Sequence, residues 1–253
     1  MIKSTILKIL NRLGYHLIRT EPIGPKISDQ ALPDAACYQP YFQPWYVDKA
    51  FNDIFSLASP NTIVTIDRCH VLWILSKHTS QLEGDFIECG VYKGGTARLL
   101  AENLRQLGSN KHLHLFDTFA GMPPTGSEDF HSAGDFADTS LEQVRRYIGY
   151  PEFVHFYPGK IPDTFLSSRP VKFAFAHIDV DIYQAVLDCC KYIYPRLSPG
   201  GVMVFDDYGF ASCPGARKAI DEFFADKPEQ PLILPNAQAI VTRLPQPTSH
   251  DAS

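Results

Sequence analysis

Two short apolar runs in the second half of the chain each lead into acidic residues. The runs are residues 173–178 and 202–205, and between them apolar side chains recur every three or four residues, the spacing of a helix face. A Pro-Gly-Gly sequence at 199–201 ends that periodic segment. The pattern predicts a strand, a crossover helix and a second, parallel strand.

Four carboxylates follow these two strands. They are Asp179, Asp181, Asp206 and Asp207. Neighbouring parallel strands joined by a crossover helix end at the same edge of a sheet, where ligands bind in open α/β folds. Carboxylates that lie close together repel one another unless a cation or a proton lies among them. We therefore predict a divalent metal site; the alternative is a set of helix N-caps and loop carboxylates that accept backbone N–H groups.

An earlier segment has the pattern of the first strand–loop–helix unit of a nucleotide-binding sheet. An apolar strand at 84–89 contains Glu88 near its end, a glycine-rich turn follows, and a helix opens at Thr96. The turn glycines are Gly90, Gly94 and Gly95. Their spacing is not GxGxxG, which argues against a dinucleotide site. The next strand, 112–116, ends at Asp117, an acid that commonly binds ribose hydroxyls in such sheets; the alternative is a helix-capping aspartate.

The same reasoning places the remaining elements along the chain. Further helices are expected at 49–57, 61–80, 139–148 and 214–224. Further strands are expected at 153–157, 232–234 and 239–242, the last two forming a terminal pair. Residues 117–124 are too proline-rich for a helix, and the polar, glycine-containing segment 125–137 is a candidate mobile lid.

The ends of the chain differ in character from its middle. Residues 1–20 have apolar side chains on one helical face and only positive formal charges, which predicts an amphipathic helix docked on the domain or on a second subunit. The alternative is a helix that lies on an anionic membrane surface. Residues 21–60 are expected to form a proline- and aromatic-rich arm followed by a helix, with 21–48 outside regular helix. Residues 245–253 are expected to be a flexible tail.

Composition narrows the class of protein further. The 253-residue chain is 45% hydrophobic with a formal net charge of −5, which fits one large core and gives no global indication of nucleic-acid binding. No apolar run is long enough to cross a bilayer, and the N-terminus lacks the features of a signal peptide. The six cysteines form no paired CxxC pattern, and Cys89, Cys189 and Cys190 lie in predicted core elements. Buried reduced thiols of this kind favour a cytoplasmic enzyme.

Four motifs together resemble a known enzyme family. They are FIECGVYKGGTARLLA at 86–101, LFDTFAGMP at 115–123, HIDVDIYQAVLDCCKYIYPRLSPGGVMVFDDYG at 177–209 and GARKAIDEFF at 215–224. In this order they are similar to the macrocin O-methyltransferase (TylF/MycF) family, over about residues 64–242. Members of that family use S-adenosylmethionine and a divalent metal, usually magnesium, to methylate hydroxyl groups, typically on sugars.

The resemblance implies a fold for the main part of the chain. Residues 61–244 would form a Rossmann-like class I methyltransferase domain of the α/β class. Its sheet would have seven mostly parallel strands, the last one antiparallel, with helices on both faces.

The resemblance also assigns candidate site residues. Around the methionine part of the cofactor it places Glu88, Gly90, Tyr92, Gly95 and Thr96. It places Asp117 at the ribose, with Phe119 and Gly121 beside the adenosine. Two further cofactor contacts are Thr65 and Ser140. The implied metal ligands are Asp181, Asp206 and Asp207, while Asp179 is assigned either to the metal or to the cofactor.

The expected chemistry is in-line transfer of a methyl group to a sugar hydroxyl that a magnesium ion positions and acidifies. Asp181 is the expected base. His177 is the second candidate, with a core histidine in a strand as its alternative, and the same alternative applies to His155. The expected partners are a small-molecule or glycan substrate and further copies of the chain, because the resemblance and the apolar first helix favour a dimer or larger assembly.

Three other functions compete with this one. The first is metal-dependent methyl transfer to a catechol-like or other small-molecule hydroxyl, since the aromatic arm could stack on a flat ring. The second is a cofactor-binding module that does not catalyse, which the intact carboxylates disfavour. The third is a nucleotide-dependent oxidoreductase, which the glycine spacing disfavours.

Overall fold

The computed structural model describes residues 43–167 and 171–245. The chain divides into two units, Met1–Phe42 and Gln43–Ser253, and every described residue belongs to the second. The expectations for the helix at 1–20, for the arm at 21–42 and for the tail at 246–253 therefore lie outside the described residues, as does Cys37.

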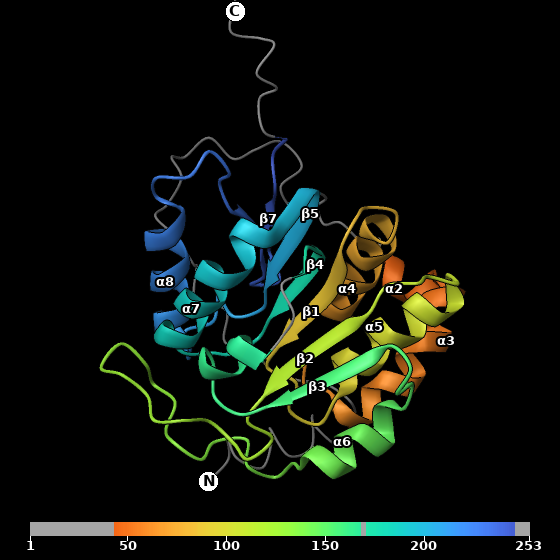
Figure 1. The fold of residues 1–253 in the computed structure, drawn as a ribbon, viewed down its shortest axis with the longest axis horizontal. Coiled ribbons are helices and arrows are strands. Elements are labelled where there is room, and N and C mark those ends of the chain that lie inside the picture. Colours follow the sequence, from red (N-terminus) through yellow and green to blue (C-terminus); the bar gives the residue numbers. More distant parts are fainter. Residues whose placement is uncertain (1–42, 168–170, 246–253) are drawn as a thin grey trace, which may run out of the picture. The chain divides into compact units, whose positions relative to one another are not determined.

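Seven strands form one sheet in the order β3-β2-β1-β4-β5-β7-β6 (Figure 1). Their bounds are β1 Asp85–Cys89, β2 Leu113–Asp117, β3 Val154–Pro158, β4 Phe173–Ile178, β5 Leu197–Phe205, β6 Leu232–Ile233 and β7 Ala239–Thr242. The first five strands are mutually parallel, whereas β7 pairs antiparallel with both β5 and β6. The predicted mostly parallel α/β sheet with an antiparallel last strand is confirmed.

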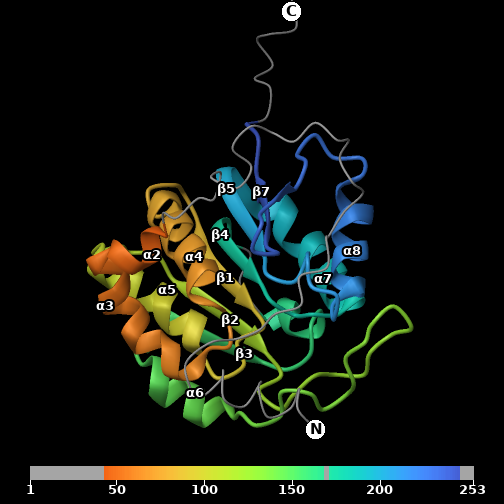
Figure 2. The ribbon, with the colours of Figure 1, turned by 180° about the vertical axis from the view of Figure 1, so that it is seen from behind.

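Helices cover both faces of this sheet (Figures 1 and 2). They are α2 Pro44–Val47, α3 Lys49–Ala58, α4 Ile66–Thr79, α5 Gly95–Gln106, α6 Leu141–Ile148, α7 Tyr183–Ile193 and α8 Pro214–Phe224. Short 3-10 turns are η1 Ser59–Asn61, η2 Asp163–Ser167 and η3 Tyr194–Arg196. Helices α3, α4 and α5 pack on one face, and α7 and α8 on the other. Within the described part of the chain, no helix combines the length and the apolar character needed to cross a membrane.

Alternation along the strands divides the core between the two faces. In β1, Phe86 belongs to the cluster with α3, α4 and α5, while Ile87 and Cys89 belong to the cluster with α7 and α8. Successive side chains of a strand point to opposite faces, so a strand that is covered on both sides is apolar at nearly every position. All six residues of β4 are buried for this reason.

Two helices, α4 and α2, differ from the expectation by more than two residues. α4 begins at Ile66 rather than at 61, because Ser59–Asn61 is a 3-10 turn and Thr65 is extended in the N-cap position, with φ −65° and ψ 157°. The expectation that 21–48 avoids helix is wrong for Pro44–Val47, which forms one helical turn. Proline is compatible with a first helical position, because the N–H that it lacks needs no partner there.

β5 is longer than predicted at its start. It begins at Leu197 and runs through the Pro-Gly-Gly sequence, which was expected to interrupt the chain between helix and strand. Gly200 adopts φ 78°, and its N–H donates to the carbonyl of Arg243 at 2.8 Å. Glycine reaches this backbone conformation without steric cost, so the strand continues across the sequence that usually breaks one.

The described cysteines are buried, reduced thiols, as predicted. Among residues 43–167 and 171–245 they are Cys69, Cys89, Cys189, Cys190 and Cys213, all buried and free of disulfide bonds. Burial raises the pKa of the Cys190 thiol well above its ordinary value, because a thiolate would lose its hydration there.

Candidate active site

A cavity of about 290 Å³ opens at the carboxyl edge of the sheet, and it is lined by residues that follow β1, β2, β3, β4 and β5. Strand pairing brings these ends together: the N–H of Asp179 donates to the carbonyl of Cys89 at 2.8 Å, and that of Asp206 to Ile178 at 2.9 Å. All four aspartates that the sequence pattern singles out line this cavity. The predicted convergence of the two acidic pairs is therefore present in the fold.

Three of the four aspartates form a compact cluster, which we call the acidic group: Asp179, Asp181 and Asp207. Each offers a carboxylate oxygen within 4.8 Å of those of the other two. The backbone helps to assemble it, because Asp181 adopts φ 58° and its N–H donates to Oδ2 of Asp207 at 3.0 Å. A left-handed backbone at a non-glycine residue is uncommon and is often retained at functional sites.

Burial and mutual repulsion act in the same direction on this group. Loss of hydration raises the pKa of Asp179 well above its ordinary value, and the neighbouring charges of Asp206 and Asp207 raise it further. The pKa of Asp207 is raised by the same two effects, desolvation and the charge of Asp181. Burial also raises the pKa of Asp181, although His131 opposes the shift. Three carboxylates this close repel one another when they are ionised, and a hard divalent cation such as Mg²⁺, which binds oxygen ligands, would compensate the repulsion.

Asp206 is held differently from the other three aspartates. It is only 1% exposed, forms an ion pair with Nη1 of Arg68, and accepts a hydrogen bond from Nε2 of Gln238 at 2.9 Å. Burial alone would raise the pKa of Asp206, but the nearby imidazole of His177, with Nε2 at 3.7 Å, and the charge of Arg68 lower it. The acidic group therefore consists of Asp179, Asp181 and Asp207, whereas the family resemblance implies Asp181, Asp206 and Asp207 as the metal ligands. A metal role for Asp206 stays a prediction.

His177 is a buried core residue. Its side chain is fully buried, its Nδ1 lies 2.7 Å from Oε1 of Glu88, and its Nε2 lies 3.7 Å from Oδ1 of Asp206. Burial opposes the charged imidazolium, but the interactions with Asp206 and Glu88 outweigh it and raise the pKa of His177 to about 10. His177 is buried within β4 and is not among the residues that line the cavity, which agrees with the core alternative. His155 lies away from the cavity, with Nε2 at 2.7 Å from Nδ1 of His112.

The glycine-rich turn is fastened by the acid at the end of β2. Oδ2 of Asp117 accepts the N–H groups of Val91 at 2.6 Å and of Tyr92 at 2.9 Å, and Oδ1 accepts that of Phe119 at 2.7 Å. None of these contacts caps a helix, because Val91 and Tyr92 precede Gly94, the N-cap residue of α5, which has no side-chain cap. Asp117 therefore braces the turn and the loop after β2, and a ribose role for it stays a prediction. The turn itself requires glycine at Gly90, where φ is 86° and an added Cβ would lie 1.7 Å from the carbonyl oxygen of Asp179.

The structure places most of the predicted cofactor residues around the cavity. Those on its wall are Gly90, Tyr92, Gly95, Thr96, Asp117, Gly121 and Asp179. Those off the wall are Thr65, Glu88, Phe119 and Ser140. Thr65 accepts a hydrogen bond from Nε of Arg68 at 3.1 Å, and Ser140 caps α6 by accepting the N–H of Gln143 at 3.4 Å. Phe119 is 5% exposed and packs in the core. The cofactor roles of all these residues stay predictions.

Several residues of the wall had no recognisable signal in the sequence. They are Asn61, Thr62, Ile63, Val64, Arg68, His131, Phe136, Phe210 and Cys213. Arg68 contacts Asp206 from α4, 138 positions earlier in the chain, and its guanidinium lies 4.8 Å from the centre of the Phe210 ring. Such pairs are set by the packing of distant elements, so local patterns do not reveal them.

The long loop between β2 and α6 reaches the cavity as well. His131 and Phe136 of this loop line the wall, and Oδ1 of Asp129 accepts the N–H of Tyr183, the first residue of α7, at 2.8 Å. The loop contains the segment 125–137 that the sequence marks as a candidate lid. Its position beside the cavity agrees with that role, and its mobility stays a prediction.

The sheet order, the antiparallel β7 and the cavity at the carboxyl edge define a Rossmann-like fold of the class I methyltransferase type. Residues 68–238, more than half of the chain, match the family described as Macrocin-O-methyltransferase (TylF). The chain belongs to this family.

Relatives and a solved structure agree with this placement. The chain is 32% identical over 153 residues to the 8-demethyl-8-(2,3-dimethoxy-alpha-L-rhamnosyl)-tetracenomycin-C 4'-O-methyltransferase of Streptomyces olivaceus, covering 55% of this chain and 58% of the relative. It is 31% identical over 155 residues to the mycinamicin III 3''-O-methyltransferase of Micromonospora griseorubida, covering 55% and 60%. These matches thus span 58% and 60% of the length of the two relatives. The O-methyltransferase NovP has a similar structure, with a TM-score of 0.64 and 26% identity, covering 73% of this chain and 83% of NovP.

Proposed function

We propose that this protein is an S-adenosylmethionine-dependent O-methyltransferase that requires Mg²⁺ and methylates a hydroxyl of a sugar carried by a natural product. The observation that carries the proposal is one cavity that joins the glycine-rich turn and Asp117 to the acidic group. Family membership supports methyl transfer to oxygen, and the rhamnosyl group in the name of one relative supports a sugar acceptor. Further copies of the chain are expected partners.

The residues around the glycine-rich turn fit the cofactor. Gly90, Tyr92, Gly95 and Thr96 offer backbone at the start of α5, and Asp117 holds that backbone in place. Glu88 of β1 lies behind the cavity wall as a fully buried carboxylate, and its Oε2 has no hydrogen-bond partner among the described residues. An orphaned buried acceptor fits a ligand that brings a donor. In this proposal these residues bind and orient the methyl donor.

The acidic group fits the metal. Asp179, Asp181 and Asp207 supply oxygen ligands, which Mg²⁺ prefers, and leave room for water or substrate hydroxyls. When bound, S-adenosylmethionine supplies an activated methyl group and Mg²⁺ lowers the pKa of a hydroxyl. Asp181 is the proposed base: it lines the cavity and its side chain is 19% exposed there, so a substrate hydroxyl can reach it.

A labelled-methyl transfer assay against sugars and glycosides, with and without Mg²⁺, tests this function. We expect transfer that EDTA abolishes and that Asp207→Asn removes, while Asp188→Asn is the matched control because its carboxylate contacts Gln184 on the exposed side of α7. Full transfer in the presence of EDTA would refute the metal requirement. Transfer to catechols but not to sugars would show that the acceptor is a catechol-like hydroxyl and not a sugar hydroxyl. Asp117→Ala should weaken S-adenosylmethionine binding in calorimetry, and NAD should not bind.

A further inference from the structure

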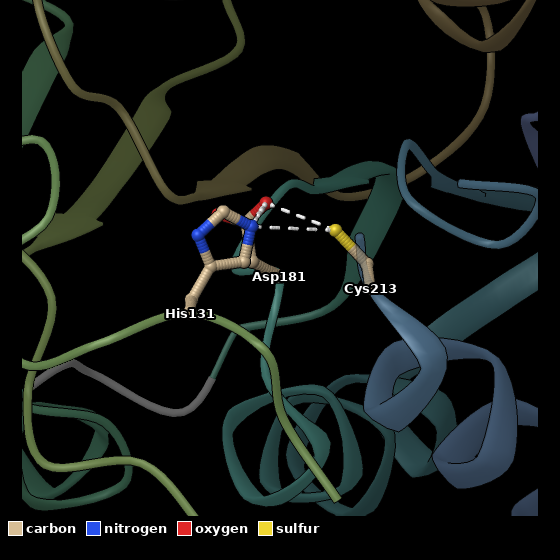
Figure 3. Close-up of side chains that lie close together, drawn as sticks. All are labelled: His131, Asp181 and Cys213. Atoms are coloured by element: carbon tan, nitrogen blue, oxygen red, sulfur yellow. Dashed lines mark hydrogen bonds and ion pairs between the residues drawn. The ribbon is translucent and has the colours of Figure 1, made fainter. Parts of the chain in front are cut away.

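A second cluster of metal-binding side chains lies next to the acidic group and shares one residue with it. His131, Asp181 and Cys213 each present one donor atom, and the three atoms lie within 4.8 Å of one another (Figure 3). They come from three separate segments: the loop before α6, the loop after β4, and the residue that precedes α8. A thiol, an imidazole and a carboxylate together form a donor set that Mg²⁺ does not favour and Zn²⁺ does.

The distances between the donor atoms match a tetrahedral ion. Nε2 of His131 lies 3.7 Å from Oδ1 of Asp181 and 3.7 Å from Sγ of Cys213, and that Sγ lies 3.4 Å from Oδ1. Zinc bonds of about 2.3 Å to sulfur and about 2.0 to 2.2 Å to nitrogen and oxygen, at tetrahedral angles, separate such donors by about 3.4 to 3.6 Å. Each measured distance agrees with this range to within about 0.3 Å.

The histidine is also oriented for metal binding. Its other ring nitrogen, Nδ1, lies 3.1 Å from Oδ2 of Asp135. A carboxylate at this position favours the tautomer with the proton on Nδ1, which leaves the lone pair of Nε2 directed at Asp181 and Cys213. Metal-binding histidines almost always have such an outer partner. The arrangement is independent of the donor distances and points to the same kind of ligand.

We propose that His131, Asp181 and Cys213 form a second cation site, next to the acidic group. The site binds a thiophilic divalent cation, of which Zn²⁺ is the expected example. Three protein ligands leave the fourth tetrahedral position open to water. The Cys213 thiol releases its proton to solvent as the thiolate binds the ion. Because Asp181 belongs to both clusters, a cation in this site takes a ligand from the acidic group. If the proposed methyl transfer holds, Zn²⁺ therefore inhibits it in competition with Mg²⁺.

Cobalt is the probe for this site, because a Co²⁺–thiolate bond gives a charge-transfer band in the near ultraviolet. The full chain is titrated with Co²⁺ in the presence of Mg²⁺, without methyl donor or acceptor, and Zn²⁺ is then added to displace the Co²⁺. We expect the band to appear, to be lost in Cys213→Ser, and to be lost on adding Zn²⁺. This readout is independent of methyl transfer, so a failed cation site and a failed enzyme function give different results.

Matched variants locate the site. Cys190→Ser should keep the band, because Cys190 does not belong to the cluster, and Asp207→Asn should keep it because only the acidic group loses a ligand. His131→Ala retains every thiol and should weaken Co²⁺ binding about 100-fold or more, while Asp135→Ala should weaken it about 10- to 100-fold. Absence of the band from the wild-type protein, or a band that survives both Cys213→Ser and His131→Ala, would overturn the proposal.

Discussion

Replacing Arg68 by methionine tests how the buried carboxylate of Asp206 is stabilised. The two side chains are 9% and 1% exposed, and they form an ion pair across the interface between α4 and the end of β5. Methionine keeps much of the volume of arginine but leaves the carboxylate without its guanidinium. Removing one partner of a buried ion pair typically costs about 3 to 5 kcal/mol, because the remaining charge stays buried.

The structure places the expected cost at the lower end of that range. Gln238 still donates to Oδ1 of Asp206 at 2.9 Å, and the imidazolium of His177 remains 3.7 Å away. We therefore expect Arg68→Met to lose about 3 kcal/mol of unfolding free energy, or about 6 to 12 °C in Tm for a domain of this size. Urea denaturation followed by circular dichroism measures the loss, and Arg146→Met, which removes an exposed arginine paired with Glu142, should change nothing measurable.

Two further measurements separate the charge from the packing. Adding Asp206→Asn to Arg68→Met removes the uncompensated charge, so the double variant should be more stable than Arg68→Met alone. Without the guanidinium the pKa of Asp206 rises, so at acid pH the carboxylate is protonated and no unpaired charge is buried. The loss of unfolding free energy in Arg68→Met should therefore grow as pH increases from acid to neutral. A variant as stable as the wild type, or a double variant less stable than Arg68→Met, would show that the ion pair does not stabilise this part of the fold.

Three other predictions follow from the same coordinates. The pKa values of the acidic group are raised, so the metal-free protein should lose stability as pH rises above the range in which ordinary aspartates titrate. Mg²⁺ should therefore raise Tm more at pH 8 than at pH 5, and equal Tm shifts at the two pH values would contradict this prediction. Gly90→Ala should be far more destabilising in urea than Gly108→Ala, which has φ +60° and nothing within 4 Å of the added Cβ and should cost about 1 to 2 kcal/mol. The pKa of His177 is raised to about 10, so its stabilising contribution is complete below the ordinary histidine pKa and is lost as pH rises through about 10; His177→Gln should lack this alkaline loss, and a parallel pH profile would disprove it.

The order and type of the elements could be predicted from the sequence because each depends on a local pattern. β4 and α8 have the bounds 173–178 and 214–224 that the sequence predicts. The convergence of four aspartates also followed, since parallel strands joined by a crossover helix end at one edge. The boundaries that differed, at α2, α4 and the start of β5, lie where proline or glycine allowed more than one conformation.

The sequence by itself determined the sheet, the glycine-rich turn and the carboxylates at the edge of the sheet. These features depend on the periodic spacing of apolar residues and on the order of the elements along the chain. Only the tertiary structure decided which carboxylates face one another. Adjacent residues at a strand end point to opposite sides, so Asp207 joins the acidic group while Asp206 turns to Arg68 and Gln238. In the same way His131 and Cys213 meet Asp181 only because three distant segments pack around one cavity, and the long-range packing that sets such side-chain directions has no signature in any local stretch of sequence.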